Sequence, residues 1–308
     1  MESLKSYAPV VLFVYNRPRH TKQTVDALKL NDGAKKTDLI IYSDAPKNDE
    51  SKPQVNSVRD HIRKIDGFKS VRIIEREENW GLAQSIIQGV TEVVNQYGKV
   101  IVLEDDIVTS PAFLQFMNQA LKFYENEKKV WHISGWNYPI DFKEVGDAFL
   151  WRGMNCWGWA TWADRWQYFE KDPEALISEW TDEEKSRFDL DGTGLYWSQV
   201  EANANDEINT WAIFWYATIF YNQGICLNPS VSYGENIGHD GTGVHCGVDT
   251  THFVGELNNK IDIVFPSQIY ESTDAVMKIK EFQKGLKRPF AVRVLSKIST
   301  ILVGRRLL

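Results

Sequence analysis

Short apolar segments alternate with amphipathic ones through the first half of the chain. The apolar segments are rich in β-branched residues and predict buried strands, while apolar positions recurring every three or four residues predict helices between them. The expected strands cover residues 9–15, 39–42, 71–74, 100–103 and 130–134. The expected helices cover residues 21–30, 53–65 and 81–97, and a further one starts at 110–111. This alternation predicts a mostly parallel sheet in a Rossmann-like three-layer α/β/α sandwich.

Two of these predictions are specific enough to be tested residue by residue. The helix from Gly81 should bury one stripe, and Ser110 followed by Pro111 should cap the helix that comes next. The stripe consists of Leu82, Ile86, Val90, Val93 and Tyr97.

The pattern changes near residue 141, where strand signals become rare and aromatic residues become frequent. Residues 151–166 contain five tryptophans, and helices are predicted at 181–188 and 195–205. Residues 211–222 predict a buried helix that ends at Gly224, and residues 236–245 form a polar, glycine-rich loop. No repeat or linker separates the halves. We therefore expect one domain over residues 1–273, with a donor half at 8–135 and an acceptor half at 136–273.

Composition narrows the class of protein. The chain has 308 residues, 43% of them hydrophobic, which is enough for a large core. Its three cysteines are far apart, which argues against a disulfide scaffold or a zinc ribbon and fits a reducing compartment. No signal peptide or membrane-spanning run is evident. We expect a cytoplasmic protein.

The tail at residues 274–308 differs in charge from the rest. It holds nine Lys or Arg against two acids, a net +7, so the remainder carries −14 of the total −7. Apolar residues recur between the basic ones, as in helices that lie on anionic membranes. The alternative is a helix that packs on the domain or on another copy. We therefore expect peripheral docking on the inner membrane face as one use of the tail.

The most informative segment is 100–106, where four apolar residues lead into Glu104, Asp105 and Asp106. A buried strand cannot hold three carboxylates, so they belong at its carboxyl end, where open parallel sheets bind ligands. Adjacent carboxylates repel one another, and Mg²⁺ or Mn²⁺ carrying substrate phosphates would neutralise them. The alternative is a solvated acidic turn.

Polar residues also follow the other expected strands at the same edge. Arg17 suits a nucleobase or a phosphate, and Asp44 can accept from a base or a ribose hydroxyl. Asn79 and Gly81 open a helix whose free N–H groups can approach a ligand. Each also has an ordinary structural explanation as a turn or a helix cap. Their common location favours a donor site, in which we also place Asn16 and Glu104.

These segments, VYNRP, YSDAP, ENWGLAQSI and VIVLEDDIVTSPAFLQF, together resemble a GT-A glycosyltransferase. The last is similar to the donor site of N-acetylglucosaminyltransferase I and related bacterial inverting enzymes. The resemblance covers residues 8–125 well. It implies a nucleotide-sugar donor, with Asp106 as the ligand of a divalent cation and Asp105 facing the ribose or the sugar. It also implies that Arg17 and Asp44 hold the nucleotide.

The resemblance further implies a carboxylate base at the start of a helix beside the acceptor. Asp206 and Glu207 are the candidates, although this chain has Asn209 and Ala212 nearer the tryptophan where the carboxylate could also be expected. Asp240 is the next acid to consider. Enzymes of this fold often recruit a late histidine to the metal, which points to His239 or His245, with incidental loop histidines as the alternative.

The tryptophan cluster has two interpretations. Most tryptophans are core residues, but Trp157, Trp159 and Trp162 are interspersed with glycine and asparagine as in a loop. Loop tryptophans stack well on sugars, so we expect acceptor contacts here.

The resulting hypothesis is a metal-dependent inverting glycosyltransferase that acts on a glycan or lipid-linked glycan, for instance in polysaccharide biosynthesis. One alternative is a nucleotidyltransferase that makes nucleotide sugars, although residues 15–20 lack the glycine-rich loop that cradles a triphosphate. The other is an inactive sugar-binding module.

Overall fold

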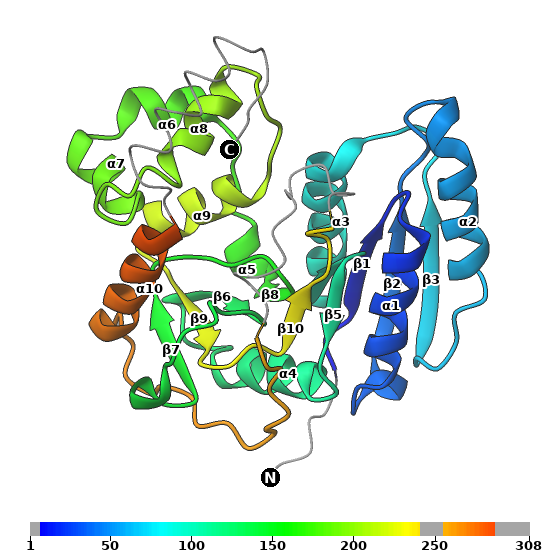
Figure 1. Cartoon of the computed structure of the whole chain (residues 1–308), viewed down its shortest axis with the longest axis horizontal. Coiled ribbons are helices and arrows are strands. Elements are labelled where there is room, and N and C mark those ends of the chain that lie inside the picture. Colours follow the sequence, from blue (N-terminus) through cyan, green and yellow to red (C-terminus); the bar gives the residue numbers. More distant parts are fainter. Residues whose placement is uncertain (1–6, 241–254, 287–308) are drawn as a thin grey trace.

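The computed structural model describes residues 7–240 and 255–286. Its centre is an eight-stranded sheet with helices on both faces, and a two-stranded ribbon stands beside it (Figure 1). The sheet confirms the predicted α/β sandwich. Its strands are β1 (Val10–Val14), β2 (Asp38–Ser43), β3 (Ser70–Glu75), β4 (Lys99–Glu104), β6 (Val130–Ser134), β7 (Ala148–Trp151), β8 (Trp159–Trp162) and β9 (Ile225–Pro229), and the ribbon consists of β5 (Ile107–Thr109) and β10 (Gly234–Asn236).

Ten α-helices are found in the described part of the chain. The longer helices connect parallel strands in the first half, and a group of helices between β8 and β9 forms a lobe above the sheet (Figure 1). They are α1 (Pro18–Lys29), α2 (Lys52–Ile62), α3 (Gly81–Tyr97), α4 (Phe113–Phe123), α5 (Ala163–Trp166), α6 (Pro173–Glu179), α7 (Asp182–Phe188), α8 (Trp197–Ala204), α9 (Ala212–Tyr221) and α10 (Thr273–Leu286).

The strand order is β3-β2-β1-β4-β8-β6-β9-β7. The first four strands are mutually parallel, as predicted. Strand β8 runs antiparallel to both β4 and β6, which makes β4, β6 and β9 point the same way. The carboxyl ends of strands from both halves of the chain therefore lie at one edge of a single sheet.

The two faces of the sheet bury different residues because side chains alternate along each strand. On β4, Ile101 and Leu103 pack with α1, α2 and α4. Val100 and Val102 face the opposite way and pack with α3, α5 and α9. The continuous apolar runs in the sequence follow from this double burial.

Two local predictions in the first half were wrong. Leu82 and Tyr97 are exposed on α3, and Ala83 and Val94 complete its buried face instead. Ser110 does not cap α4, which begins at Phe113 after Ala112 with no side-chain cap. Helix α9 was predicted to end at Gly224, but the left-handed residue that follows the helix is Gln223 (φ 54°).

The first part of the basic tail packs on the domain. Helix α10 buries Ala275, Val276 and Ile279 against aromatic residues that surround β7, and Lys280 pairs with Asp191 at 2.6 Å. For Val276 and Ile279 the alternative interpretation holds, namely a helix that packs on the domain. Residues 287–308 lie outside the described part, and membrane docking through them stays a prediction. No helix in the described ranges is long and apolar enough to cross a membrane.

Candidate functional site

The acidic segment lies where the sequence placed it, at the carboxyl end of β4. Glu104 is the last residue of the strand, and Asp105 and Asp106 form the turn that leads into β5. Both aspartates are buried, with 4% and 5% of their surfaces exposed. The hydroxyl of Thr24 donates to the Asp105 carbonyl oxygen at 2.9 Å and so ties the turn to α1. The acids are therefore held in place by the sheet and the first helix.

Arg17 is the cation that faces these acids. It directly precedes α1, and its Nη2 donates to Asp105 Oδ1 and to Asp106 Oδ2, the latter at 2.9 Å. Burial by itself would lower the pKa of the guanidinium, but the two carboxylates outweigh burial and raise that pKa. Arg17 is thus bound to the acids in the structure, and its predicted contact with the nucleotide stays a prediction. Asn16 lies beside it, partly exposed, at the same edge.

One arginine does not balance this cluster. Burial raises the pKa of Glu104 to about 8, with further contributions from Asp106 and Asp105. Burial and the neighbouring Asp106 raise the pKa of Asp105 to about 6, despite the opposing effect of Arg17. With Asp105 and Asp106 ionised and one arginine present, the formal charge is −1, and it becomes −2 once Glu104 also loses its proton. A divalent cation would cancel that charge, and carboxylate oxygen is the ligand that Mg²⁺ and Mn²⁺ prefer.

The loop after β10 covers Asp106. The Ile237 N–H donates to the Asp106 carbonyl oxygen at 2.9 Å, and Gly238 lies against the Asp106 side chain. A Cβ on Gly238 would stand 2.2 Å from Asp106 Oδ2 and 3.0 Å from Arg17 Nη1. Only glycine leaves room for both groups at this point. Asn236, whose Oδ1 accepts from the Gly238 N–H at 2.7 Å, was not predicted as a site residue, because its contact depends on the β5–β10 pairing.

Asp44 holds the start of α3 at the same edge. It is buried, and its two oxygens accept from the backbone N–H groups of Ala45, Trp80 and Gly81 at 2.8–2.9 Å and from Asn79 Nδ2 at 3.1 Å. These bonds fix the start of α3 to the end of β2. The Gly81 N–H that was expected to meet a ligand is thus bound to Asp44, and the assignment of Asp44 to the nucleotide stays a prediction.

The glycine-rich loop is described only as far as Asp240. His239 lies edge-on to Trp157 with ring centroids 5.3 Å apart, and Asp240 pairs with His20 Nε2 at 3.2 Å. His245 lies outside the described residues. Within residues 7–240 and 255–286, no three His, Cys, Asp or Glu side chains converge into a cation site.

Asp206 and Glu207 do not open a helix. They follow the end of α8, both exposed, and Asp206 has a left-handed backbone with φ 56°. Helix α9 begins only at Ala212, so the expected place of these acids at the start of a helix is wrong. Asn209, farther along this connection, contacts Lys171 and lines a small hollow with Ala83 and Gln88 of α3. The connection thus faces the helix that starts beside the donor edge.

Two of the three tryptophans predicted to contact the acceptor are core residues. Trp159 and Trp162 belong to β8, with 1% and 3% of their surfaces exposed. Trp159 stacks on Trp211, and Trp162 donates its indole N–H to the Leu121 carbonyl oxygen. Their assignment to the acceptor is therefore wrong. Trp157 is partly buried near the loop of His239, so its assignment stays a prediction.

Arg76 is a further cation at this edge, and no motif in the sequence marks it. It follows β3, is 8% exposed, and stacks on Trp80 with its Cζ 3.5 Å from the ring centroid. Its Nε and Nη1 have no hydrogen-bond partner among the described residues. Burial lowers the pKa of its guanidinium. The only sequence signal was its position directly after a strand.

Comparison with known proteins places the chain in a family. The sequence profile of the GNT-I family matches residues 1–190, well over half of the chain. The chain belongs to the GNT-I family. This membership agrees with the resemblance drawn from the sequence segments, since GNT-I is a family of GT-A glycosyltransferase domains. No curated protein matches the chain significantly.

Similar solved structures are also glycosyltransferases, although distant from this GNT-I family member. TarS from S. aureus is 14% identical with a TM-score of 0.29, over 41% of this chain and 21% of TarS. TarS 1–349, in complex with UDP-GlcNAc, is 10% identical with a TM-score of 0.40, over 73% of this chain and 57% of that chain. The mannosyltransferase PcManGT from Pyrobaculum calidifontis, in complex with GDP-Man and Mn²⁺, is 13% identical with a TM-score of 0.41, over 71% of each chain.

Proposed function

We propose that this protein is a metal-dependent inverting glycosyltransferase that moves a sugar from a nucleotide-diphosphate sugar to a hydroxyl of a glycan or glycolipid. One observation carries the proposal, namely the buried Asp105–Asp106 turn at the carboxyl end of β4, whose negative charge Arg17 does not balance. A divalent cation would supply the missing positive charge, and that cation would in turn bind the diphosphate of the donor. Membership of the GNT-I family supports UDP-N-acetylglucosamine as the first donor to test.

The described residues fit Mn²⁺ or Mg²⁺ at Asp106. The nearby ligands are carboxylate oxygens, and the lack of a three-residue cluster in the described part of the chain suits a cation that takes its remaining ligands from phosphates and water. When bound, such a cation stabilises the negative charge that develops on the departing nucleoside diphosphate.

The protein groups around the acids have separable roles in this proposal. Asp106 holds the cation, and Asp105 faces the ribose or the sugar. Arg17, once its carboxylate partners are shared with a cation, is free to turn a guanidinium N–H toward a phosphate oxygen. Gly238 keeps the covering loop close without touching the Asp106 oxygen. Inversion also needs a base that accepts the acceptor proton, for which Asp206, Glu207 and Asp240 stay the predicted candidates.

Thermal unfolding in the presence of nucleotides tests the proposal. UDP with Mn²⁺ should raise the melting temperature by roughly 4 °C at a hundred times its dissociation constant, since a ligand that binds only the folded state stabilises it by about 2.7 kcal/mol. UDP in EDTA should give a much smaller shift. An equal shift in EDTA would contradict metal dependence. Stabilisation by free sugars without any effect of UDP would instead favour the sugar-binding module.

A glycine variant sharpens this experiment. Gly238→Ala would force a methyl group onto the Asp106 carboxylate, so the shift produced by UDP and Mn²⁺ should fall by at least half. Gly285→Ala is the matched control, because a Cβ there meets nothing within 4 Å. A full shift in the Gly238 variant would show that Asp106 does not take part in binding.

A further inference from the structure

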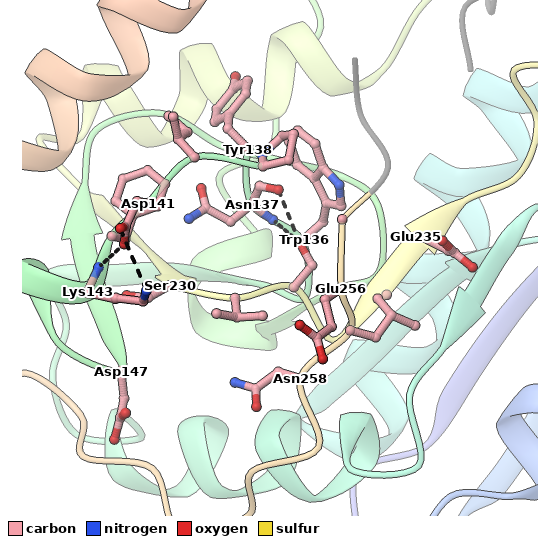
Figure 2. Close-up of a pocket in the computed structure, with 18 of the residues that line it drawn as sticks. Trp136, Asn137, Tyr138, Asp141, Lys143, Asp147, Ser230, Glu235, Glu256 and Asn258 are labelled. Carbon is pink, nitrogen blue, oxygen red and sulfur yellow. Dashed lines mark hydrogen bonds and ion pairs between the residues drawn. The ribbon is translucent and has the colours of Figure 1, made fainter. Parts of the chain in front are cut away.

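A second hollow lies at the same edge of the sheet, in the acceptor half. It has a volume of about 730 Å³ and lies between the segments that follow β6 and β9, the start of β7 and residues 255–258 (Figure 2). Because β6 and β9 run in the same direction as β4, the segments after them lie at the edge that carries Asp105 and Asp106. Ligands in large α/β sheets bind at this edge.

Two buried polar side chains line this cavity without partners. Asn137 is 2% exposed, and both its Nδ2 and its Oδ1 lack a hydrogen bond within the described ranges. Ser230 is 8% exposed, and its Oγ likewise has no described partner. The Ser232 hydroxyl accepts from the Asn137 backbone N–H at 2.9 Å and donates to the Asn137 carbonyl oxygen at 3.0 Å. These two bonds fix the backbone from which the Asn137 side chain projects. Leaving such groups unpaired costs about 1–3 kcal/mol each, which indicates that a ligand completes them.

The chemistry of this pair selects the ligand class. A carboxamide donates and accepts at once, and a serine hydroxyl does the same. Sugar hydroxyls are the matching partners, because each also donates and accepts. Figure 2 shows the Asn137 amide between the Asp141–Lys143 pair and Trp136, in the wall of the cavity.

The charge of the lining restricts the sugar further. Asp141 accepts from the Lys143 backbone N–H at 2.9 Å with the Lys143 Nζ nearby, and Asp147 pairs with Lys260 at 2.7 Å. Glu256 has no ion-pair partner among the residues the structure describes, and its carboxylate lies among the cavity side chains in Figure 2. Glu235 points away from them toward β5. An unpaired carboxylate at the cavity repels phosphate, sulfate and uronate groups.

The cavity is close to the donor site. Gly234 lines it, and Asn236, two residues and about 7 Å farther along β10, accepts from Gly238 beside Asp106. Trp136 at its wall contacts Trp157 at 4.4 Å between ring centroids, and Trp157 contacts His239 at 5.3 Å. A saccharide in the cavity is therefore separated from Asp105 and Asp106 only by the length of β10.

We propose that this cavity binds the acceptor saccharide through Asn137 and Ser230, and that the acceptor is neutral or positively charged at this position. The inference rests on the proposed glycosyl transfer and specifies its second substrate. It replaces the buried Trp159 and Trp162 as acceptor contacts.

Saturation-transfer NMR with three disaccharides tests the inference. Chitobiose is neutral, diglucosamine is cationic and digalacturonate is anionic, and each is added to full-length protein with saturating UDP and Mg²⁺ so that the donor site is occupied. Chitobiose and diglucosamine should bind, and digalacturonate should bind at least about tenfold more weakly. Asn137→Ala should weaken chitobiose about tenfold, since two hydrogen bonds are lost. Ser230→Ala is a second variant, and it should reduce the affinity for chitobiose by a smaller factor than Asn137→Ala.

Control variants outside the cavity distinguish an effect of the cavity residues on binding from a general effect of the substitution. Asn126→Ala, at the exposed turn after α4, should leave chitobiose affinity unchanged. Glu256→Gln should improve digalacturonate binding several-fold, whereas Glu183→Gln on exposed α7 should not. Wild-type affinity for chitobiose in both the Asn137 and Ser230 variants, equal binding of digalacturonate, or no disaccharide binding to a UDP-bound protein would each overturn the inference. Failure of UDP itself to bind would overturn the proposed function and, with it, this inference.

Discussion

Asp106→Asn should abolish turnover of a nucleotide sugar, with a loss of roughly 10³-fold or more. The substitution keeps the size of the side chain but removes the charge on which a cation at this turn depends. Asp106 is 5% exposed and is covered by the loop of Gly238, so water or a neighbouring acid cannot readily replace it. UDP release from UDP-N-acetylglucosamine in Mn²⁺ is the measurement.

The control for this variant is Asp60→Asn. Asp60 is exposed on α2 and pairs with Arg63 at 3.3 Å, so it shares the charge but not the environment of Asp106. It should retain wild-type turnover. An Asp106→Asn protein that keeps more than a tenth of the wild-type rate would contradict the assignment of the cation to this residue.

Asp44→Ala should be the most destabilising single substitution at the donor edge. It would leave the Trp80 and Gly81 N–H groups and the Asn79 amide without their carboxylate partner. Unpaired buried donors and a lost helix cap cost about 3 kcal/mol together, which corresponds to a fall in melting temperature of roughly 5 °C. Thermal unfolding followed by circular dichroism measures this.

Asp49→Ala provides the comparison for Asp44. Asp49 lies a few residues later on the surface and pairs with the exposed Lys52, so its loss should shift the melting temperature by no more than about 1 °C. A similarly small shift for Asp44→Ala would mean that its hydrogen bonds do not hold the start of α3. Asp44 would then be free for its predicted contact with the nucleotide.

The parallel half of the fold was predictable because local and global signals agree there. The runs at β1, β2 and β4 are continuous and apolar, as burial on both faces requires, and the helices between them have regular apolar spacing. The acidic turn was found for the same reason, since charges that follow a buried strand have to lie at its end.

The other half was less predictable because its contacts are made between distant segments. Strand β8 is only four residues long and two of them are tryptophans, so its sequence resembled a loop until it was placed between β4 and β6. Asp44 looked like a ligand residue, and only the fold shows the start of α3 meeting it. Asn137 and Ser230 carry no motif, and their lack of partners is visible only in three dimensions.

The central claim is that the Asp105–Asp106 turn binds a nucleoside diphosphate together with a divalent cation. Electron paramagnetic resonance of free Mn²⁺, during titration with protein in the presence of UDP, tests it most directly. The account predicts that wild-type protein removes one equivalent of free Mn²⁺ only when UDP is present, and that Asp106→Asn removes none. Free Mn²⁺ that stays constant with wild-type protein and UDP, or that falls equally with the Asp106 variant, would contradict the account.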